Sequence, residues 1–265
     1  MELITSRRNP LVGRLRALHQ GRGRREQGLL LLEGTHQLQE LLRLGLRPEQ
    51  LLATPAWIDR HGALLAACPQ PPQPVGEEVL AAVATTEHPD GVVATLAAAA
   101  LPQPSGRAGF VLALDHLQDP GNLGTLLRTA LAAGVEEVWL GGGADPLQPK
   151  VLRASAGAAL ALPLRRAAER AELQGWLAEA AGRGQQLVAT LVDGAGAQPY
   201  WHLDWTRPTV LLLGNEGAGL DPALAALASH RVTIPHSTAV ESLNVAVAAA
   251  PLLLERWRQE RMPAI

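Results

Sequence analysis

The chain has 265 residues, of which 47% are hydrophobic and 18% are charged, and its formal net charge is −2. This length allows one large or two modest domains, and no apolar run approaches the roughly 20 residues of a transmembrane helix. With Cys68 as its one cysteine, the chain can form neither an intramolecular disulfide nor a cysteine-based zinc site. The N-terminus lacks the apolar segment of a secretory signal peptide, so we expect a cytoplasmic location.

Positive charge is concentrated at the N-terminus. Residues 1–28 carry seven arginines against two glutamates, whereas the rest of the chain has an excess of acidic residues. Apolar residues at helical spacing between Asn9 and Gln20 predict a short, basic amphipathic helix. This segment suits RNA phosphates, but an ordinary solvated helix explains the same charges, because no aromatic side chains alternate with the arginines.

Strand-like and helix-like segments then alternate, which predicts a small α/β layer. The expected strands are 29–32, 50–53 and 91–96, and the expected helices are 35–44, 57–67 and 77–84. Residues 98–108 have the proline, serine and glycine content of a linker. We therefore expect an N-terminal domain at 1–97 and a second domain at 109–265.

The second domain contains continuous apolar runs that predict buried strands, at 110–114, 137–140, 186–192, 209–213 and 231–234. Continuous runs are typical of parallel strands that helices cover on both faces. The expected fold class is therefore α/β with a parallel sheet. Ligands of such sheets bind beyond the carboxyl ends of the strands.

Three polar, glycine-containing segments are candidates for the site. Residues 214–220 (Gly-Asn-Glu-Gly-Ala-Gly-Leu) directly follow an expected strand, and glycine lets the backbone approach a ligand closely. Farther along, Ile-Pro at 234–235 precedes Glu-Ser-Leu-Asn at 241–244, where Ser242 is expected to cap a helix that begins near Leu243. Upstream, Asp-Pro-Gly-Asn at 119–122 opens a helix that continues through Arg128.

In combination these segments resemble the three motifs of the SpoU/TrmH family of RNA ribose 2′-O-methyltransferases, in the family's order, within residues 110–258. Residues 6–10, 31–34 and 89–92 are similar, more loosely, to the family's substrate-binding domain. The resemblance implies a trefoil-knotted parallel-sheet methyltransferase domain of the SPOUT superfamily and S-adenosylmethionine as cofactor. From the histidine spacing and the single cysteine, we expect no metal. The knot rests on the resemblance alone, because knots are rare among folds.

The resemblance also assigns catalytic residues. Arg128 is implied to approach the ribose and its phosphate and to assist loss of the 2′-proton. Because a guanidinium is not normally a base, Arg128 can instead lower the pKa of the hydroxyl while it orients the phosphate. Asn122 and Glu216 are implied to lie in the catalytic pocket, with Glu216 orienting Arg128 or the substrate, although structural roles in turns and caps stay open. Ser242 and Asn244 are implied to contact the substrate or Arg128.

Backbone groups of Gly214, Ile234 and Leu243 are implied to hold the adenine and ribose of the cofactor, although tight packing explains the same residues. The chain departs from its relatives at His236, Thr238 and Ala239, which leaves the cofactor affinity open. His236 can also be interpreted as a general base, although the family needs no histidine at this position. The full expected cofactor-binding set is Thr190, Leu191, Gly214, Asn215, Gly217, Ile234, Pro235 and Leu243.

The expected partners are RNA and a second copy of the chain, with no membrane. A separate N-terminal domain favours ribosomal RNA over tRNA. The segment 150–157 resembles a basic segment of the family, but its charges also suit an ordinary helix C-terminus. The homodimer follows from the resemblance, and the apolar side chains of the last helix equally fit a core. The expected RNA-binding residues are Arg7, Arg8, Arg14, Lys150 and Arg153.

Other ligand classes fit less well. No Lys-Ser/Thr pair follows the glycines as in a P-loop, and no Gly-x-Gly-x-x-Gly fingerprint occurs. The histidines show no close metal-ligand spacing. The remaining alternative is a non-catalytic RNA-binding or ribosome-associated protein of the same fold. Retention of the five expected catalytic residues together favours the enzyme.

Overall fold

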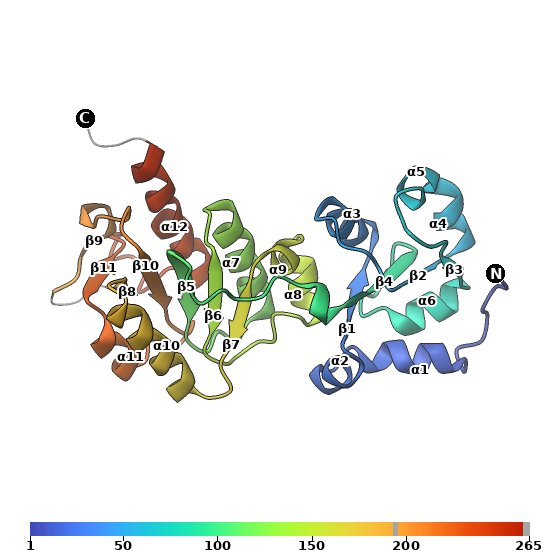
Figure 1. Ribbon diagram of the computed structural model, residues 1–265, viewed down its shortest axis with the longest axis horizontal. Helices are drawn as coiled ribbons and strands as arrows, with labels where there is room; N and C mark the ends of the chain where they lie inside the picture. The colour runs from blue at the N-terminus through green and yellow to red at the C-terminus, as the bar shows by residue number, and fades with distance from the viewer. Residues whose placement is uncertain (193–195, 262–265) are drawn as a thin grey trace. The chain divides into compact units, whose positions relative to one another are not determined.

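The computed structural model describes residues 1–192 and 196–261, and the chain divides into two compact units (Figure 1). The first unit comprises Met1–Leu101 and Asp145–Ala161, and the second comprises Pro102–Ala144 and Leu162–Ile265. The segment 145–161 thus packs with the first unit, although it connects two strands of the second. The sequence did not indicate that this segment packs with the first unit, because the packing of a segment depends on contacts with residues distant in sequence. The domain limits of 1–97 and 109–265 stay a prediction.

The first unit is built on a four-stranded sheet in the order β1-β4-β2-β3. Strand β4 is antiparallel to β1 and β2, whereas β2 and β3 are parallel. The expected helix at 57–67 is two short helices, because the backbone at His61 leaves helical geometry (φ −119°, ψ 33°). The strands are β1 (Leu29–Glu33), β2 (Gln50–Ala53), β3 (Gln73–Pro74) and β4 (Val92–Ala97). The helices are α1 (Pro10–Ala17), α2 (Gly21–Gln27), α3 (Thr35–Arg43), α4 (Pro55–Arg60), α5 (Gly62–Leu65), α6 (Glu77–Val83), η1 (Ala98–Ala100), α8 (Pro149–Ala154) and α9 (Ala158–Ala161).

The second unit contains a seven-stranded sheet in the order β7-β6-β5-β10-β8-β11-β9, with parallel neighbours, which confirms the expected fold class. Strands β7 and β9 were not expected, because they are short and lack an apolar run. The strands are β5 (Phe110–Leu114), β6 (Glu137–Leu140), β7 (Leu164–Arg166), β8 (Gln186–Thr190), β9 (Gln198–Pro199), β10 (Thr209–Leu213) and β11 (His230–Thr233). The helices are α7 (Pro120–Ala132), α10 (Arg170–Gly182), η2 (Tyr200–His202), α11 (Pro222–Leu227) and α12 (Val245–Arg261).

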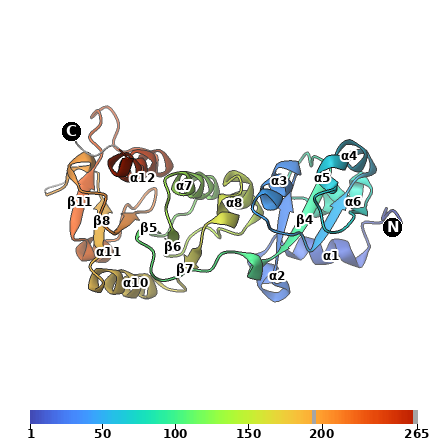
Figure 2. The ribbon, with the colours of Figure 1, turned by 45° about the horizontal axis from the view of Figure 1, so that its top comes forward.

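Helices cover both faces of this sheet: α7 and α12 lie on one face, and α10 and α11 on the other (Figure 2). Strands β5 and β10 are therefore buried along their whole length. The register pairs Leu114 of β5 with Leu213 of β10, so the two central strands end side by side. The loops that follow them leave the same edge of the sheet, and this edge holds the candidate site.

Among the described residues, no helix combines the length and the apolar character needed to cross a membrane.

Candidate active site

A cavity of about 640 Å³ lies where β8, β10 and β11 end. This volume is typical of a site for a small organic ligand. The lining comes from the last residue of each strand and the residues after it, from the loop that enters α12, from the first turn of α12, and from one residue of α7. Its residues are Asn122, Thr190, Leu191, Val192, the run 213–220, Thr233, Ile234, His236, the run 241–245, and Ala248.

The loop after β10 is closed on itself. The amide of Asn215 donates to the carbonyl of Gly219 (2.9 Å), and the amide of Gly219 donates back to the carbonyl of Asn215 (3.1 Å). The side-chain oxygen of Asn215 accepts from the amides of Gly217 and Ala218 at 2.9 and 3.0 Å. A Cβ at position 214 would collide with the backbone of Gly219 and of the residue after it, so only glycine fits there. We call residues 214–220 the glycine loop.

The carboxylate of Glu216 ties the glycine loop to the start of α7. It accepts hydrogen bonds from the amides of Gln118 (3.1 Å) and Asp119 (3.0 Å) and from Nδ2 of Asn122 (3.3 Å). Partial burial acts to raise the pKa of the Glu216 carboxyl, but these hydrogen bonds to the ionised form outweigh it and lower the pKa below its ordinary value. Glu216 is therefore an ionised acceptor in this arrangement, and a poor proton acceptor for catalysis.

Asn122 also contacts the segment 241–244, which leads into α12. Its Oδ1 accepts from Nδ2 of Asn244 at 3.0 Å, while Oδ1 of Asn244 accepts from the amides of Ala246 (2.9 Å) and Val247 (3.3 Å). Asn244 therefore caps α12. The expectation that Ser242 caps a helix beginning near Leu243 is wrong, because α12 begins at Val245 and a capping side chain must directly precede the first turn.

The side chains of Glu216, Asn122 and Asn244 thus form one hydrogen-bonded chain that joins three segments distant in sequence. We call it the Glu216–Asn122–Asn244 chain. All three residues also line the cavity, and so does the exposed Ser242.

Arg128 lies apart from this chain. It is exposed on α7, does not line the cavity, and has no hydrogen bond or ion pair within residues 1–192 and 196–261. Six residues at 100° each place it about 120° around the helix from Asn122. The described residues therefore give no support for an orientation of Arg128 by Glu216 or Asn244. The guanidinium is free to meet an outside anion.

Most of the expected cofactor-binding residues line the cavity, namely Thr190, Leu191, Gly214, Asn215, Gly217, Ile234 and Leu243. Pro235 is exposed and does not. Oγ1 of Thr190 is buried without a hydrogen-bond partner among the described residues, so a polar group is available to a ligand. Nδ1 of His236 lies 2.7 Å from the carbonyl oxygen of Ile234, and because a carbonyl only accepts, Nδ1 is the donor in this contact.

Several lining residues were not in the expected site set. Ala218, Gly219, Leu220 and Glu241 lie inside the candidate segments, and Val192, Leu213 and Thr233 lie at or just after strand ends, which could have identified them. Val245 and Ala248 belong to the first turn of α12, and its position on the cavity was decided by packing. No group of three or more His, Cys, Asp or Glu residues suited to a metal ion occurs in the described part of the chain.

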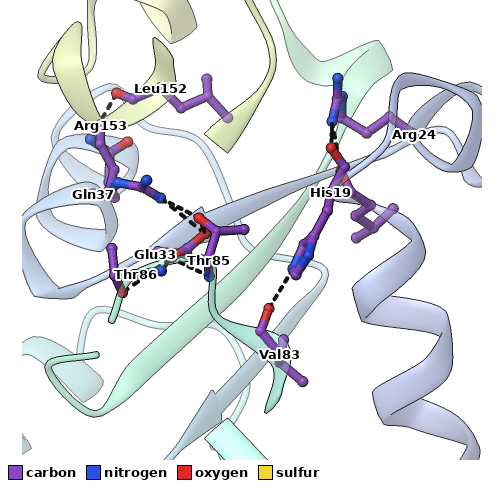
Figure 3. A network of polar contacts seen from close by, with 10 residues as sticks. His19, Arg24, Glu33, Gln37, Val83, Thr85, Thr86, Leu152 and Arg153 are labelled. Atoms are coloured by element: carbon purple, nitrogen blue, oxygen red, sulfur yellow. Dashed lines mark hydrogen bonds and ion pairs between the residues drawn. The ribbon is translucent and has the colours of Figure 1, made fainter. Parts of the chain in front are cut away.

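The expected RNA-binding residues have different environments. Arg153 points toward Glu33 and Thr85 (Figure 3), with an ion pair of 3.0 Å to the buried Glu33 carboxylate and a hydrogen bond of 2.7 Å to the Thr85 hydroxyl. Its charge is therefore already paired with a buried carboxylate inside the first unit. Lys150 is exposed.

We call the arginine-rich segment 1–28 the basic arm. In this segment, Arg7 forms an exposed ion pair of 3.2 Å with Glu78. Arg8 and Arg14 are exposed, and neither side chain has a hydrogen bond or ion pair within the described residues. Arg24 was not among the expected RNA-binding residues. It is buried and donates to the carbonyls of Leu18 and His19 at the end of α1 (Figure 3). The arm is thus partly structural and partly an open basic surface.

Comparisons with known proteins agree with this geometry. Residues 109–254 match the SpoU rRNA Methylase family, and residues 9–94 match the MRM3-like substrate binding domain. The chain belongs to the SpoU rRNA methylase family.

Two relatives are similar over nearly their whole length. An uncharacterised tRNA/rRNA methyltransferase of Synechocystis sp. is 45% identical, over 97% of this chain and 94% of the relative. The 23S rRNA (guanosine(2553)-2′-O)-methyltransferase RlmP of Bacillus subtilis is 33% identical, over 96% of this chain and 98% of the relative. The crystal structure of an AdoMet-bound rRNA methyltransferase from Sinorhizobium meliloti has a TM-score of 0.81 at 31% identity and covers 99% of both chains.

The lowered pKa of Glu216 generates a prediction. Because the folded state favours the ionised carboxyl, its stabilising effect is complete above the pKa of the unfolded chain and is lost as the pH falls through the folded-state pKa. We expect Glu216→Gln to reduce the free energy of unfolding at pH 7 by about 1 kcal/mol or less, since the side chain is partly exposed. The difference from the wild type should shrink on acidification, which urea denaturation over a pH series would measure.

The matched control is Glu241→Gln, because Glu241 also lines the cavity but accepts no hydrogen bond within the described residues. It should match the wild type throughout. A wild-type advantage over Glu216→Gln that stays constant as the pH falls would contradict the assignment.

Proposed function

We propose that this protein transfers a methyl group from S-adenosylmethionine to the 2′-oxygen of a ribose in ribosomal RNA. The observation that carries the proposal is the Glu216–Asn122–Asn244 chain, which gathers the three motif segments around one cavity. Membership of the SpoU rRNA methylase family supports the enzyme class. The Bacillus relative is named for 2′-O-methylation of 23S rRNA, which favours ribosomal RNA over tRNA.

The cavity suits S-adenosylmethionine in size and chemistry. Leu213, Ile234, Leu243 and Val245 supply an apolar lining for an adenine, and the unpartnered Oγ1 of Thr190 offers a polar contact. We assign the backbone groups of the expected cofactor-binding residues to the adenosine part, and leave Pro235 outside the contact set. A trefoil knot around this site stays an expectation from the family.

When bound, S-adenosylmethionine supplies an electrophilic methyl group on its sulfonium sulfur. The protein must then hold the ribose hydroxyl in line, and such positioning accounts for much of the acceleration in group-transfer enzymes. Glu216 and Asn122 do this indirectly, by fixing the loops of the cavity. Arg128 is the candidate to bind the RNA phosphate and stabilise negative charge on the 2′-oxygen, because its guanidinium has no partner among the described residues and stays charged.

The basic arm supplies a second RNA contact. Arg8 and Arg14 have the exposed, unpaired guanidinium groups that phosphate binding needs, and we include the exposed Lys150. Arg7 and Arg153 contribute less, because each is already paired with a glutamate. A ribosomal RNA substrate favours a cytoplasmic location.

Arg128 provides the direct test. Arg128→Ala should lower the transfer of labelled methyl groups to undermethylated ribosomal RNA by about 100-fold or more, the usual loss when a group that stabilises transition-state charge is removed. Arg128→Lys should also be poor, because an ammonium cannot bind phosphate in the bidentate manner of arginine. The site of methylation is mapped on the labelled RNA.

The control is Arg107→Ala, another exposed arginine of the second unit, and it should retain activity. Binding of S-adenosylmethionine without methyl transfer to either ribosomal RNA or tRNA would favour the non-catalytic alternative. Labelling of tRNA alone would refute the ribosomal RNA assignment.

For the basic arm, we expect Arg8→Glu with Arg14→Glu to weaken binding to ribosomal RNA and to reduce the dependence of affinity on salt, because fewer counterions are released. Filter binding at several salt concentrations measures both. Glu78→Gln, which frees Arg7 from its ion pair, should not weaken binding. Equal RNA affinity of the doubly substituted protein and the wild type would exclude the basic arm as an RNA-binding surface.

We also propose a homodimer, supported by an apolar stripe on α12. Val247, Leu254 and Trp257 are 61%, 44% and 43% exposed, and the first two lie seven residues apart, which is about two helical turns. Helix α7 packs beside α12, so a second copy on this stripe would lie near Arg128. Leu252 and Leu253 of the same helix belong to the core.

Val247→Glu with Leu254→Glu should convert the dimer to a monomer in light scattering after size-exclusion chromatography, because two buried charges oppose association. The rate of methyl transfer should also fall in this double variant. Leu227→Glu, an exposed apolar position on the opposite face of the sheet, is the control and should remain dimeric. A monomeric wild type would contradict the assembly.

A further inference from the structure

A buried acidic residue lies beside the site but outside the three motifs. Asp115 directly follows β5, and its side chain is only 3% exposed. Its backbone amide donates to the carbonyl of Leu213 (2.9 Å), so the residue prolongs the pairing of the two central strands. Its Oδ2 accepts from the amide of Asp221 at 3.1 Å. An ionised carboxyl is costly to bury, and it persists only where a partner compensates its charge.

Arg170 supplies the compensating charge. It is the first residue of α10, and its Nε lies 3.4 Å from Oδ1 of Asp115, which has no hydrogen bond among the described residues. Nη1 of the same guanidinium lies 2.9 Å from Oδ2 of Asp221. Asp221 in turn caps α11, because its Oδ1 accepts from the amide of Ala223 at 2.8 Å. One arginine at the start of α10 therefore joins two carboxylates, one directly after β5 and one at the start of α11.

This cluster holds the downstream end of the glycine loop. The loop ends at Leu220, which lines the cavity and packs against the core under α10 and α11, and Asp221 follows directly. The upstream part is held by Glu216, through the amides of Gln118 and Asp119. The short turn at 115–119 thus holds the loop on both sides of the exposed residues Gly217 to Gly219. Downstream the contact is through Asp115, and upstream it is through the amides bonded to Glu216 and through the carbonyl of His116, which accepts from Nδ2 of Asn215 at 2.8 Å.

We propose that Asp115 and Arg170 are positioning residues that fix the glycine loop in the shape that binds S-adenosylmethionine. The inference rests on the proposed function for its ligand, but the shape of the loop is independent of that function. Neither side chain lines the cavity, so neither is expected to touch the ligand. Their effect is exerted through Asp221 and Leu220.

The experiment compares the wild type with Arg170→Gln and with the double variant Asp115→Asn, Arg170→Gln. Arg170→Gln leaves the Asp115 carboxylate buried without its cation, so the turn and the loop should separate. The double variant removes that charge, and the asparagine amide oxygen can still accept from Asp221. Arg183→Gln, at the other end of α10, is the matched control.

Two measurements are made on each protein. Hydrogen exchange of the amides of residues 217–221, without ligand, reports the shape of the loop. Calorimetry reports the dissociation constant of S-adenosylmethionine. For Arg170→Gln we expect both exchange and dissociation constant to rise about tenfold, as for loss of a hydrogen bond to a charged group. The double variant should recover most of both, and Arg183→Gln should match the wild type.

Recovery by the double variant distinguishes positioning from a general loss of packing, which a second substitution would worsen. Unchanged exchange in Arg170→Gln, or faster exchange with unchanged affinity, would overturn the inference. Wild-type protein that binds no S-adenosylmethionine would overturn the proposed function, and with it the ligand assigned to this loop. Because exchange is measured without ligand, the two failures are distinguishable.

Discussion

The candidate site depends on the hydrogen-bonded chain from Glu216 through Asn122 to Asn244. Each of these side chains belongs to a different segment: Glu216 to the glycine loop, Asn122 to the start of α7, and Asn244 to the loop that enters α12. The carboxylate and the two amides are complementary donors and acceptors, so each residue satisfies the next. Because Glu216 and Asn244 are exposed, each of these hydrogen bonds contributes modestly to stability. Their main effect is to fix the relative positions of the three segments that line the cavity.

The same contacts limit the chemistry that each residue can perform. Glu216 uses its carboxylate oxygens to accept from backbone amides and Asn122, and Asn244 uses its oxygen to cap α12. These groups are occupied, so they shape the site more than they react in it. Arg128 is the converse case, an exposed cation with no partner in the described part of the chain. These environments support the proposed roles, which are positioning by the polar chain and charge stabilisation by Arg128.

Charge pairing also explains why similar basic residues have different roles. Arg153 and Arg24 are arginines in basic stretches of the sequence, yet they satisfy a buried glutamate and the carbonyls that end α1. Arg8 and Arg14 occupy exposed positions without such partners. A count of positive charges cannot separate the two groups, because burial and the nearest acceptor decide which guanidinium groups remain available to RNA.

The sequence by itself determined the parallel sheet, most strand limits and the segments of the site, because continuous apolar runs and glycine turns are local patterns. Residues 110–114, 137–140 and 209–213 were expected as strands and are strands. Only the tertiary structure decided that Asn244 and not Ser242 caps α12, that segment 145–161 packs with the first unit, and that Asp115 meets Arg170. These features depend on partners far apart in the chain, which become neighbours only when the strands pair and the helices pack.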